Sequence, residues 1–240
     1  KRTEKIAQLS YLDPLTQLMN RKSFTQTLSK LTARATQSHS ELALLFIDLD
    51  GFKKINDTMG HQMGDSVLQE VTKRIGAFAD QNKLGRWNGD EFLVALPYSD
   101  AQTAQAIASA IITSISQVIT VNNNSVHLGA TVGIAMCPEH STEAAELIQF
   151  ADLVMCEQKA STNRTPALFS NELQQKVLDT QVILEGLQQA TERRQLYLCY
   201  QPIVSAKDST FCSFEALLRW DFAGRFIGPD EFIPLAEKSG

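Results

Sequence analysis

The chain has 240 residues, of which 43% are hydrophobic and 20% charged, so a packed soluble core is expected and disorder over the whole length is excluded. The net charge of −5 argues against nonspecific binding to nucleic acid, and no apolar run approaches the length of a membrane span. Four scattered cysteines are typical of reduced thiols in a cytoplasmic protein. Because the chain starts at Lys1 without a signal-peptide pattern, we expect a piece of a longer protein, anchored to the inner membrane only through segments outside this sequence.

The first half of the chain alternates between helical and strand patterns. Residues 1–12 are typical of the end of a polar helix, Asp13-Pro14 predicts a helix start, and Asn20 is suited to cap the next helix. The apolar run 41–47 predicts a central strand buried on both faces, and residues 62–79 predict a helix.

The following residues add two strand pairs and complete a domain. Strands are predicted at 84–87 and 91–97, because Asn88-Gly89 is the commonest signal for a tight hairpin turn. Further elements are predicted as helices 101–119 and 142–159, a strand 126–136 facing 118–121, and a last strand 167–169. This order predicts an α+β fold in which helices cover a mostly antiparallel sheet.

Beyond residue 170 the pattern starts again. A polar helix over 170–194 is suited to link two domains, and strands 196–203 and 211–220 are followed by a helix opening near Pro229. We therefore expect a signalling or linker helix end at 1–12, a first domain at 13–170, a linker helix at 171–195 and the truncated start of a second domain at 196–240.

Two acidic segments carry the chemistry that the first domain offers. The strand ending in Asp48-Leu49-Asp50 places both aspartates on one side, and Asp50 is also a suitable N-cap for the segment that follows. Asp48 has no capping role, and a carboxylate that ends a buried strand is costly unless a cation lies beside it. Asp90 and Glu91 sit in the hairpin turn, either as an ordinary acidic turn or as partners of Asp48 around a hard cation such as Mg²⁺.

Several spaced motifs add a family resemblance to this interpretation. They are Asp13-Pro14-Leu15-Thr16 with Asn20-Arg21, Asp48-Leu49-Asp50-Gly51-Phe52-Lys53 with Asn56-Asp57, Gly60-His61 with Gly64-Asp65, Arg86-Trp87-Asn88-Gly89-Asp90-Glu91-Phe92, and Ala151-Asp152 with Lys159. Together they resemble the GGDEF domain of diguanylate cyclases. The later motifs Tyr200-Gln201-Pro202-Ile203-Val204, Glu215-Ala216-Leu217-Leu218-Arg219-Trp220 and Phe232-Ile233-Pro234-Leu235-Ala236-Glu237 resemble the opening of an EAL domain, the cyclic di-GMP phosphodiesterase family.

The resemblance implies a nucleotide-cyclase-like fold, then the opening strands of an incomplete TIM-type barrel. It implies that Asp48, the Leu49 carbonyl and Asp90 bind Mg²⁺ or Mn²⁺, and that Glu91 assists the metal or accepts the 3′-hydroxyl proton. It places Asn56 and Asp65 on guanine, and Lys53 and Lys159 on the phosphates. The backbone at Gly51 and Phe52 is a further phosphate site, since helix N-termini bind anions, and Asn88 and Gly89 lie where the backbone approaches the nucleotide.

By the same resemblance, Glu215 is a metal ligand of the second domain, and Gln201 and Arg219 contact cyclic di-GMP. A buried ion pair between Glu215 and Arg219 is the structural alternative. The partners implied are GTP and cyclic di-GMP, with no nucleic acid. Because each copy of the first domain would hold one GTP, a homodimer is needed for synthesis of cyclic di-GMP.

The sequence departs from the family pattern in three features. Asn88 replaces the first signature glycine, although Asn tolerates the positive φ of a turn. Thr162 and Asn163 stand where the family has Gly and a basic residue, and the inhibitory R-x-x-D motif expected over 79–82 is absent, so product inhibition by that route is not expected.

Two functions follow from these observations. The first is an enzyme that binds Mg–GTP and condenses two GTP molecules to cyclic di-GMP and pyrophosphate. The second is a degenerate GTP-binding module that regulates the phosphodiesterase in the full-length chain, and the departures at Asn88 and after Lys159 motivate it.

Overall fold

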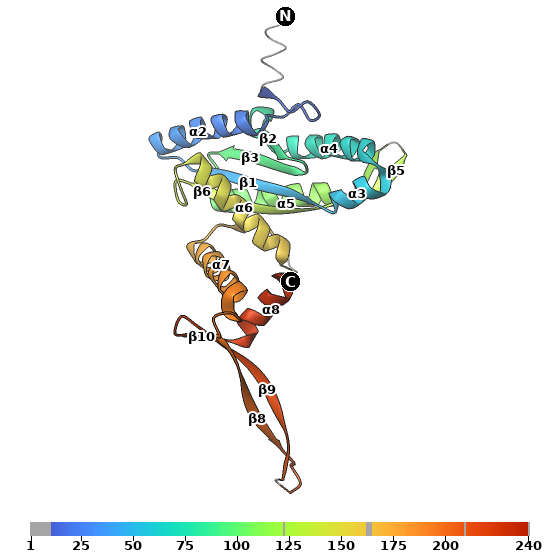
Figure 1. Ribbon diagram of the computed structural model, residues 1–240. Helices are drawn as coiled ribbons and strands as arrows, with labels where there is room; N and C mark the ends of the chain where they lie inside the picture. The colour runs from blue at the N-terminus through green and yellow to red at the C-terminus, as the bar shows by residue number, and fades with distance from the viewer. Residues whose placement is uncertain (1–10, 122, 162–164, 209, 240) are drawn as a thin grey trace, which may run out of the picture. The chain divides into compact units, whose positions relative to one another are not determined.

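The protein is described by a computed structural model covering residues 11–121, 123–161, 165–208 and 210–239, so most of the helix expected at 1–12 lies outside the described residues. The chain divides into two compact units, Lys1–Ser170 and Asn171–Gly240. Figure 1 shows the elements of each unit. No helix in the described ranges is long and apolar enough to cross a membrane.

A five-stranded sheet forms the centre of the first unit. Its strands run in the order β2-β3-β1-β6-β7, and their bounds are β1 Leu42–Asp50, β2 Leu84–Asn88, β3 Glu91–Pro97, β6 Gly129–Cys137 and β7 Ala167–Leu168. Only β6 and β7 pair in parallel, so the expectation of a mostly antiparallel sheet is confirmed. The central strand β1 is buried on both faces from Leu42 to Leu49, as its continuous apolar sequence predicts.

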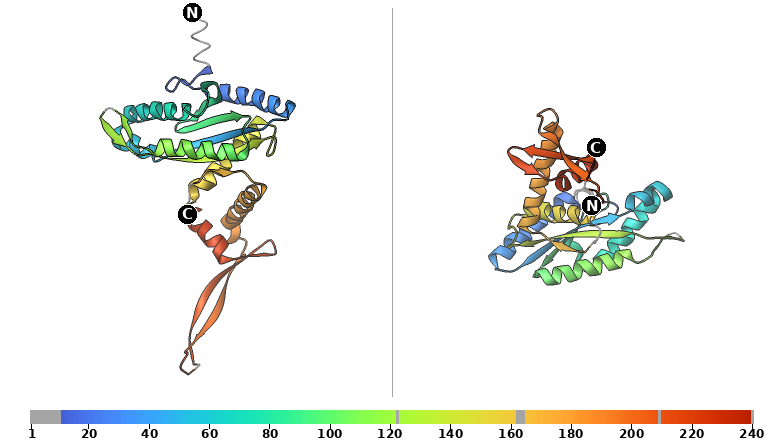
Figure 2. Two further views of the ribbon diagram at one scale, coloured as in Figure 1. Left: turned by 180° about the vertical axis from the view of Figure 1, so that it is seen from behind. Right: turned by 90° about the horizontal axis from the view of Figure 1, so that it is seen from below.

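Helices cover both faces of this sheet (Figures 1 and 2). The helices that the structure describes in full in this unit are α2 Arg21–Gln37, α3 Phe52–Met59, α4 His61–Gly76, α5 Ala101–Ser116 and α6 Ala144–Ala160, with a short 3₁₀ turn at Gln81–Lys83. Side chains of β1 alternate between two cores: Leu45 and Ile47 pack with residues of α4 and α5, whereas Leu44 and Phe46 pack with residues of α2 and α6. This alternation fixes the strand register and so fixes which way the polar side chains at the end of β1 point.

Two local predictions for the first unit are wrong. Asp13 does not begin a helix: its Oδ1 accepts hydrogen bonds from the Thr16 amide at 2.8 Å and the Thr16 hydroxyl at 2.7 Å, which closes a turn instead. The expected strand 126–136 is also interrupted, because β5 Asn124–Val126 pairs with β4 Ile119–Val121 in a separate small hairpin. The N-cap at Asn20 is confirmed, since its side chain accepts from the Ser23 amide at 3.0 Å.

The second unit contains the expected helix and strand pair. Its elements are α7 Asn171–Ala190, β8 Leu196–Val204, β9 Phe211–Phe222, β10 Arg225–Ile227 and α8 Pro229–Ser239. The β8–β9 hairpin extends as a long ribbon (Figure 2), and β10, which the sequence patterns do not predict, pairs with β9. A small core around the fully buried Trp220 holds the helices to the base of the ribbon.

Arg86 ties the N-terminal turn to the β2–β3 hairpin. Its Nε and Nη2 donate to the Gly89 carbonyl at 2.9 and 2.8 Å, and its Nη1 donates to Asp13 Oδ1 at 3.1 Å. Both members of the Arg86–Asp13 pair are mostly buried, with side chains 15% and 18% exposed. Burial opposes the ionised form of Asp13, but the hydrogen bonds from Thr16 and Arg86 outweigh it and hold the pKa of Asp13 below its ordinary value.

Replacing Arg86 with alanine is expected to destabilise the first unit by about 2 kcal/mol, because Asp13 and the Gly89 carbonyl lose charge-assisted hydrogen bonds. Urea unfolding measures this change. Lys83→Ala is the matched control, since its pair with Asp80 is surface-exposed and worth no more than about 0.5 kcal/mol. Equal losses in the two variants would contradict the prediction.

His140 gives the fold an acid-sensitive contact. Its Nδ1 accepts a hydrogen bond from the Met136 amide at 2.9 Å, and its ring lies against Phe169 with centroids 5.2 Å apart. Burial lowers the pKa of His140, opposed by the nearby charge of Glu139. The folded state therefore binds this proton less readily than the unfolded chain, so its contribution to stability is complete above about pH 6.5 and is lost as pH falls through the folded pKa.

Urea midpoints measured from pH 8 to pH 5 should fall on the acid side in the natural protein and fall less in His140→Gln, which retains an acceptor for the Met136 amide without the titration. At pH 8 the variant should lose on the order of 1 kcal/mol or less. The exposed His127 provides the control, and His127→Gln should keep the natural profile. Parallel profiles for the natural protein and His140→Gln would rule out this contact as the cause.

Candidate active site

The site begins at the end of the central strand β1. Asp48 stands opposite Glu91 on β3 and opposite Thr131 on β6, and it is only 6% exposed. The apolar residues before it are anchored in both cores, so the strand register holds the carboxylate in place. Asp50 accepts hydrogen bonds from the hydroxyl of the same Thr131 at 3.0 and 3.1 Å, so the two aspartates are neighbours at this end of the sheet.

The β2–β3 turn is bonded directly to this strand end. The Leu49 amide donates to the Asp90 carbonyl at 3.3 Å, which joins the two acidic segments through the backbone. Gly89 has φ 42°, whereas Asn88 is the exposed last residue of β2 and is not among the described residues with positive φ. The tolerance of Asn for positive φ is therefore not needed at residue 88, because the glycine that follows makes the turn.

Lys159 reaches the same place from the last turn of α6. Its Nζ donates to Asp48 Oδ1 at 2.5 Å, and its side chain is 44% exposed while that of Asp48 is 9% exposed. The helix comes this close because β6 has Gly133 beneath it, where a Cβ atom would lie 2.1 Å from the Ala151 carbonyl oxygen. Burial of Asp48 predicts a cation beside it, and Lys159 is that cation.

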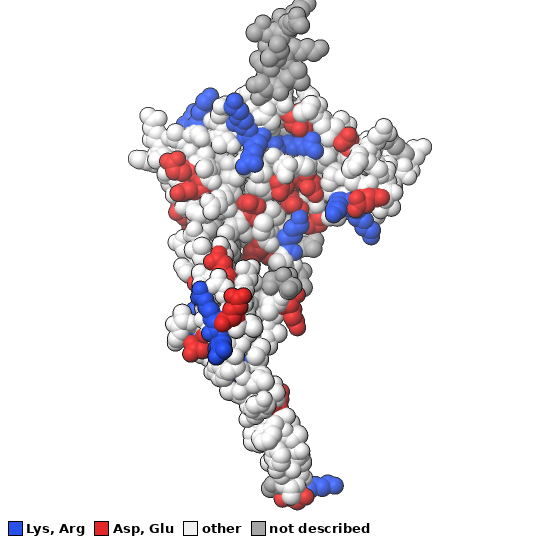
Figure 3. Space-filling model, viewed as in Figure 1, with Lys and Arg blue, Asp and Glu red and all other residues white. Residues whose placement is uncertain are grey.

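The carboxylates of the site raise one another's pKa values. Burial raises the pKa of Asp48, opposed by the bond and charge of Lys159 and reinforced by the charges of Asp90 and Asp50. Burial also raises the pKa of Glu91, with further increases from the charges of Asp48, Asp152 and Asp90. Acidic side chains gather at the middle of this face of the first unit (Figure 3). Such a cluster favours a bound cation.

The residues expected to hold the nucleotide lie at α3 and α4. Gly51 precedes α3 with φ 84°, Phe52 is buried, and Lys53 is exposed on the first turn. The Asn56 side chain packs on Gly64 of α4, where a Cβ atom would lie 1.9 Å from Asn56 Oδ1. Asp65, the next residue, is exposed. Asn56 and the segment containing Asp65 are thus brought together.

Asp152 is a site residue to which the sequence analysis gave no role. It lies on α6 seven residues before Lys159, a spacing that puts both side chains on one face of the helix, and its charge acts on Glu91. Its Oδ1 also accepts a weak hydrogen bond from Cys156 Sγ at 3.6 Å, and burial together with the Asp152 charge raises the pKa of Cys156 to about 11. The two-turn spacing was the available signal.

The structure describes some of the remaining expected site residues and not others. In the second unit Gln201 stands opposite Glu215 in the β8–β9 register, and Arg219 donates to the Leu218 carbonyl at 2.9 Å. Glu215 is exposed, so the alternative of a buried ion pair with Arg219 is wrong. Thr162 and Asn163 lie outside the described residues.

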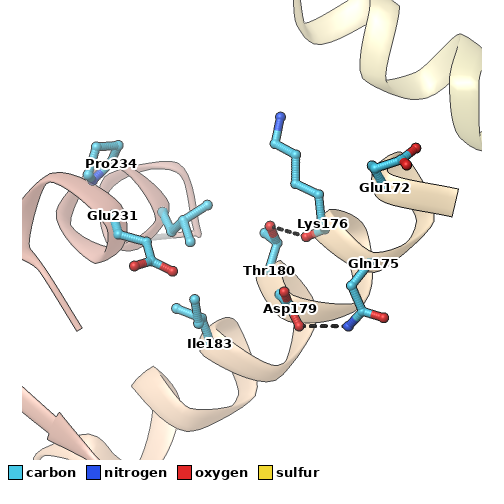
Figure 4. Close-up of a pocket in the computed structure, with 9 residues that line it drawn as sticks. Glu172, Gln175, Lys176, Asp179, Thr180, Ile183, Glu231 and Pro234 are labelled. Carbon is cyan, nitrogen blue, oxygen red and sulfur yellow. Dashed lines mark hydrogen bonds between the residues drawn. The ribbon is translucent and has the colours of Figure 1, made fainter. Parts of the chain in front are cut away.

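A separate cavity of about 600 Å³ lies between α7 and α8 in the second unit (Figure 4). Gln175 donates to Asp179 along its α7 wall, and Glu231 and Pro234 come from α8. None of the expected site residues lines it. The cavity is therefore distinct from the acidic cluster at the end of β1.

The donor set suits one kind of metal. The described part of the chain contains no group of three or more His, Cys, Asp or Glu side chains arranged to hold a metal. Mg²⁺ does not need such a group, because it uses one or two carboxylates and completes its shell with phosphate oxygens and water. Asp48 and Asp90, with the adjoining Leu49 carbonyl, fit that requirement.

Comparisons with known proteins agree with this geometry. Residues 10–165 match the family described as diguanylate cyclase, GGDEF domain, and residues 184–240 match the EAL domain. The chain is 36% identical over 237 residues to the bifunctional diguanylate cyclase/cyclic di-GMP phosphodiesterase MucR of Pseudomonas aeruginosa, covering 98% of this chain and 35% of that protein. It is 32% identical over 239 residues to the cyclic di-GMP phosphodiesterase PdeR of Escherichia coli, covering 99% and 36%. The chain therefore spans about a third of the length of these relatives.

Solved structures resemble the first unit. The GGDEF domain of TpbB from Pseudomonas aeruginosa is 35% identical with a TM-score of 0.67, covering 70% of this chain and 99% of that one. The coiled coil and GGDEF domain of DgcB from Caulobacter crescentus, solved with cyclic di-GMP, is 25% identical with a TM-score of 0.63, covering 70% and 90%. The expected fold class is confirmed, and the chain belongs to the GGDEF, or diguanylate cyclase, family, with a GGDEF domain followed by part of an EAL domain.

Proposed function

We propose that the domain at 13–170 binds GTP with Mg²⁺ or Mn²⁺ and that two such domains condense two GTP molecules to cyclic di-GMP. The observation that carries this proposal is the pairing of Asp48 with Glu91 across β1 and β3, with Asp90 bonded through its carbonyl to Leu49. A fixed set of carboxylates at the end of a buried strand, with a lysine beside it, is suited to metal-assisted phosphoryl transfer.

The reaction balances as two successive nucleotidyl transfers. The 3′-oxygen of one GTP bonds to the α-phosphorus of the other, the bond from that phosphorus to the bridging oxygen of the β-phosphate breaks, and pyrophosphate leaves. The 3′-oxygen of the other nucleotide then bonds in the same way to the remaining α-phosphorus, a second pyrophosphate leaves, and the ring closes. Because each domain binds one GTP, the two sites must face one another in a homodimer.

Different residues are assigned to metal binding, proton transfer and phosphate binding according to where they lie. Asp48, Asp90 and the Leu49 carbonyl would hold the metal, which neutralises phosphate charge when bound. Glu91 is suited to accept the 3′-hydroxyl proton, since its raised pKa brings it nearer to the pH at which a general base works best. Lys53 would bind phosphates.

The chain's own backbone and amides would hold the rest of the nucleotide. The backbone amides after Gly51, at the start of α3, offer donors to phosphate, and Asn56 with Asp65 offers an acceptor and donor set that matches the guanine edge. For the second domain we propose Glu215 as a metal ligand, with Gln201 and Arg219 on cyclic di-GMP, in the whole phosphodiesterase.

Asn88 supports a second candidate function. It projects a side chain at the exposed end of β2, where the family signature has glycine, so a domain that binds GTP without turnover and regulates the following phosphodiesterase is the alternative. Calorimetric titration with GTP and chromatographic detection of cyclic di-GMP, on the same concentrated protein, separate the two. Binding with product supports the cyclase, binding without product supports the module, and absence of binding defeats both.

The Asp48→Asn variant should lose about 100-fold or more in cyclic di-GMP formation, a barrier increase of about 2.7 kcal/mol, because the metal loses a charged ligand. Product formed at saturating GTP and Mg²⁺ is the measurement. Asp80→Asn is the control, since its carboxylate pairs only with Lys83 on the surface in the described structure. Unchanged turnover in Asp48→Asn would remove this residue from the metal site.

Asn88→Gly tests the departure from the signature. Since Gly89 rather than Asn88 has the positive φ, no backbone requirement holds Asn at this position. We expect a higher rate of cyclic di-GMP formation, because glycine permits closer backbone approach and a misplacement of about 1 Å can cost on the order of 100-fold in rate. The melting temperature should change little.

Equal rates for Asn88→Gly and the natural protein would show that the side chain does not crowd the nucleotide. A large fall in melting temperature would show that Asn88 is held by the fold. Asn82→Gly, at an exposed position before β2, controls for the general cost of a new glycine.

A further inference from the structure

The ion pair between Asp48 and Lys159 occupies the position that the proposed metal site requires. Asp48 is fixed by the register of β1, and its Oδ1 already accepts a hydrogen bond of 2.5 Å from the Lys159 ammonium. A divalent metal bound to the same carboxylate would sit about 2.0 to 2.1 Å from its oxygen. Two cations at such separations repel one another in a partly buried site, so a metal on this carboxylate disfavours the lysine and the two compete for it.

The two partners differ in their freedom to move. The Asp48 side chain is 9% exposed and lies between β3 and β6, whereas the Lys159 side chain is 44% exposed at the last turn of α6. A lysine carries its charge on a flexible four-carbon stem. Exchange at this site therefore moves the lysine and leaves the carboxylate in place.

The neighbouring carboxylates place the Lys159 ammonium in a negatively charged site that would also attract a metal cation. Besides Asp48, the carboxylates of Asp50 and Asp90 act on Lys159. A buried ionised carboxylate without a counter-ion is destabilising, so a cation beside Asp48 stabilises its ionised form before any nucleotide arrives. Lys159 supplies it from within the chain.

We propose that Lys159 is the resident counter-ion of Asp48, that it competes with the divalent metal for this carboxylate, and that metal binding releases its ammonium toward the nucleotide phosphates. This inference rests on the proposed function for the metal and the phosphates. It assigns Lys159 a role in the metal-free protein in addition to phosphate contact. It predicts opposite effects of removing the lysine: tighter binding of metal alone, and weaker binding of nucleotide.

The test uses the whole chain and Mn²⁺ alone as the probe, without nucleotide. Lys159→Met should bind Mn²⁺ about tenfold more tightly than the natural protein, because the competing positive charge is removed; calorimetry and the electron paramagnetic resonance of free Mn²⁺ measure this. The same variant should bind GTP in the presence of Mg²⁺ about tenfold more weakly. Its melting temperature should fall without metal and recover when Mn²⁺ is added.

Three variants make the result specific. Lys159→Arg keeps the charge and should keep weak Mn²⁺ binding. Lys53→Met removes another expected phosphate contact, from an exposed position on α3, and should weaken GTP binding without changing Mn²⁺ binding. The double variant Asp48→Asn with Lys159→Met should lose the gain in Mn²⁺ affinity.

Unchanged or weaker Mn²⁺ binding by Lys159→Met would overturn the proposal, and so would a gain that survives in the double variant. If Lys159→Met does not fold, Lys159→Gln repeats the test with a neutral side chain that still donates a hydrogen bond to Asp48. The Mn²⁺ titration requires neither GTP binding nor turnover. A natural protein that binds no GTP would defeat the proposed function, while competition for Asp48 would still be read from Mn²⁺.

Discussion

The constraint on which the candidate site depends is a charged group at the end of a strand that is otherwise buried on both faces. The residues of β1 before Asp48 are committed to two cores, so the carboxylate cannot turn toward solvent without disturbing the packing of the sheet. Its burial is tolerated because Lys159 arrives from α6. In our proposal, a metal that binds here competes with Lys159 for Asp48, and a phosphate meets the lysine that the metal releases.

Close packing of α6 on the sheet is what brings that lysine within reach. At Gly133 the helix backbone lies where a side chain would otherwise be, and the two-turn spacing on α6 carries Asp152 and Lys159 to one side. On the other side of the site, the backbone bond from Leu49 to Asp90 and the contacts of Arg86 with Gly89 hold the hairpin turn. Carboxylates from β1 and β3 are thus placed by backbone and packing rather than by contacts among themselves.

The sequence predicted those parts of the fold that local patterns determine. The buried run of β1, the Asn88-Gly89 hairpin and the cap at Asn20 each follow from composition or turn chemistry within a few residues. The predictions that were wrong or incomplete concern contacts between residues far apart in the sequence. Asp13 reads as a helix cap, but Thr16 closes a turn around it and Arg86, 73 residues away, completes its hydrogen bonds. The need for a cation beside Asp48 was visible in the sequence, whereas its identity depended on a helix 111 residues further on.

In the proposed function, most residues assigned to nucleotide binding lie on elements other than β2, and for this reason Asn88 bears on the choice between enzyme and regulatory module. The carboxylate of Asp48, its lysine and the amides after Gly51 are placed by β1, α6 and α3, none of which involves residue 88. Asn88 is exposed at the end of β2 and pairs with Glu91, the residue proposed to accept the proton. A side chain at that position can alter the alignment of the reacting 3′-oxygen while the metal and phosphate contacts remain intact. Because alignment contributes to the rate far more than to affinity, we expect the departure from glycine to act on the chemical step and to leave GTP binding as a property that both proposed functions share.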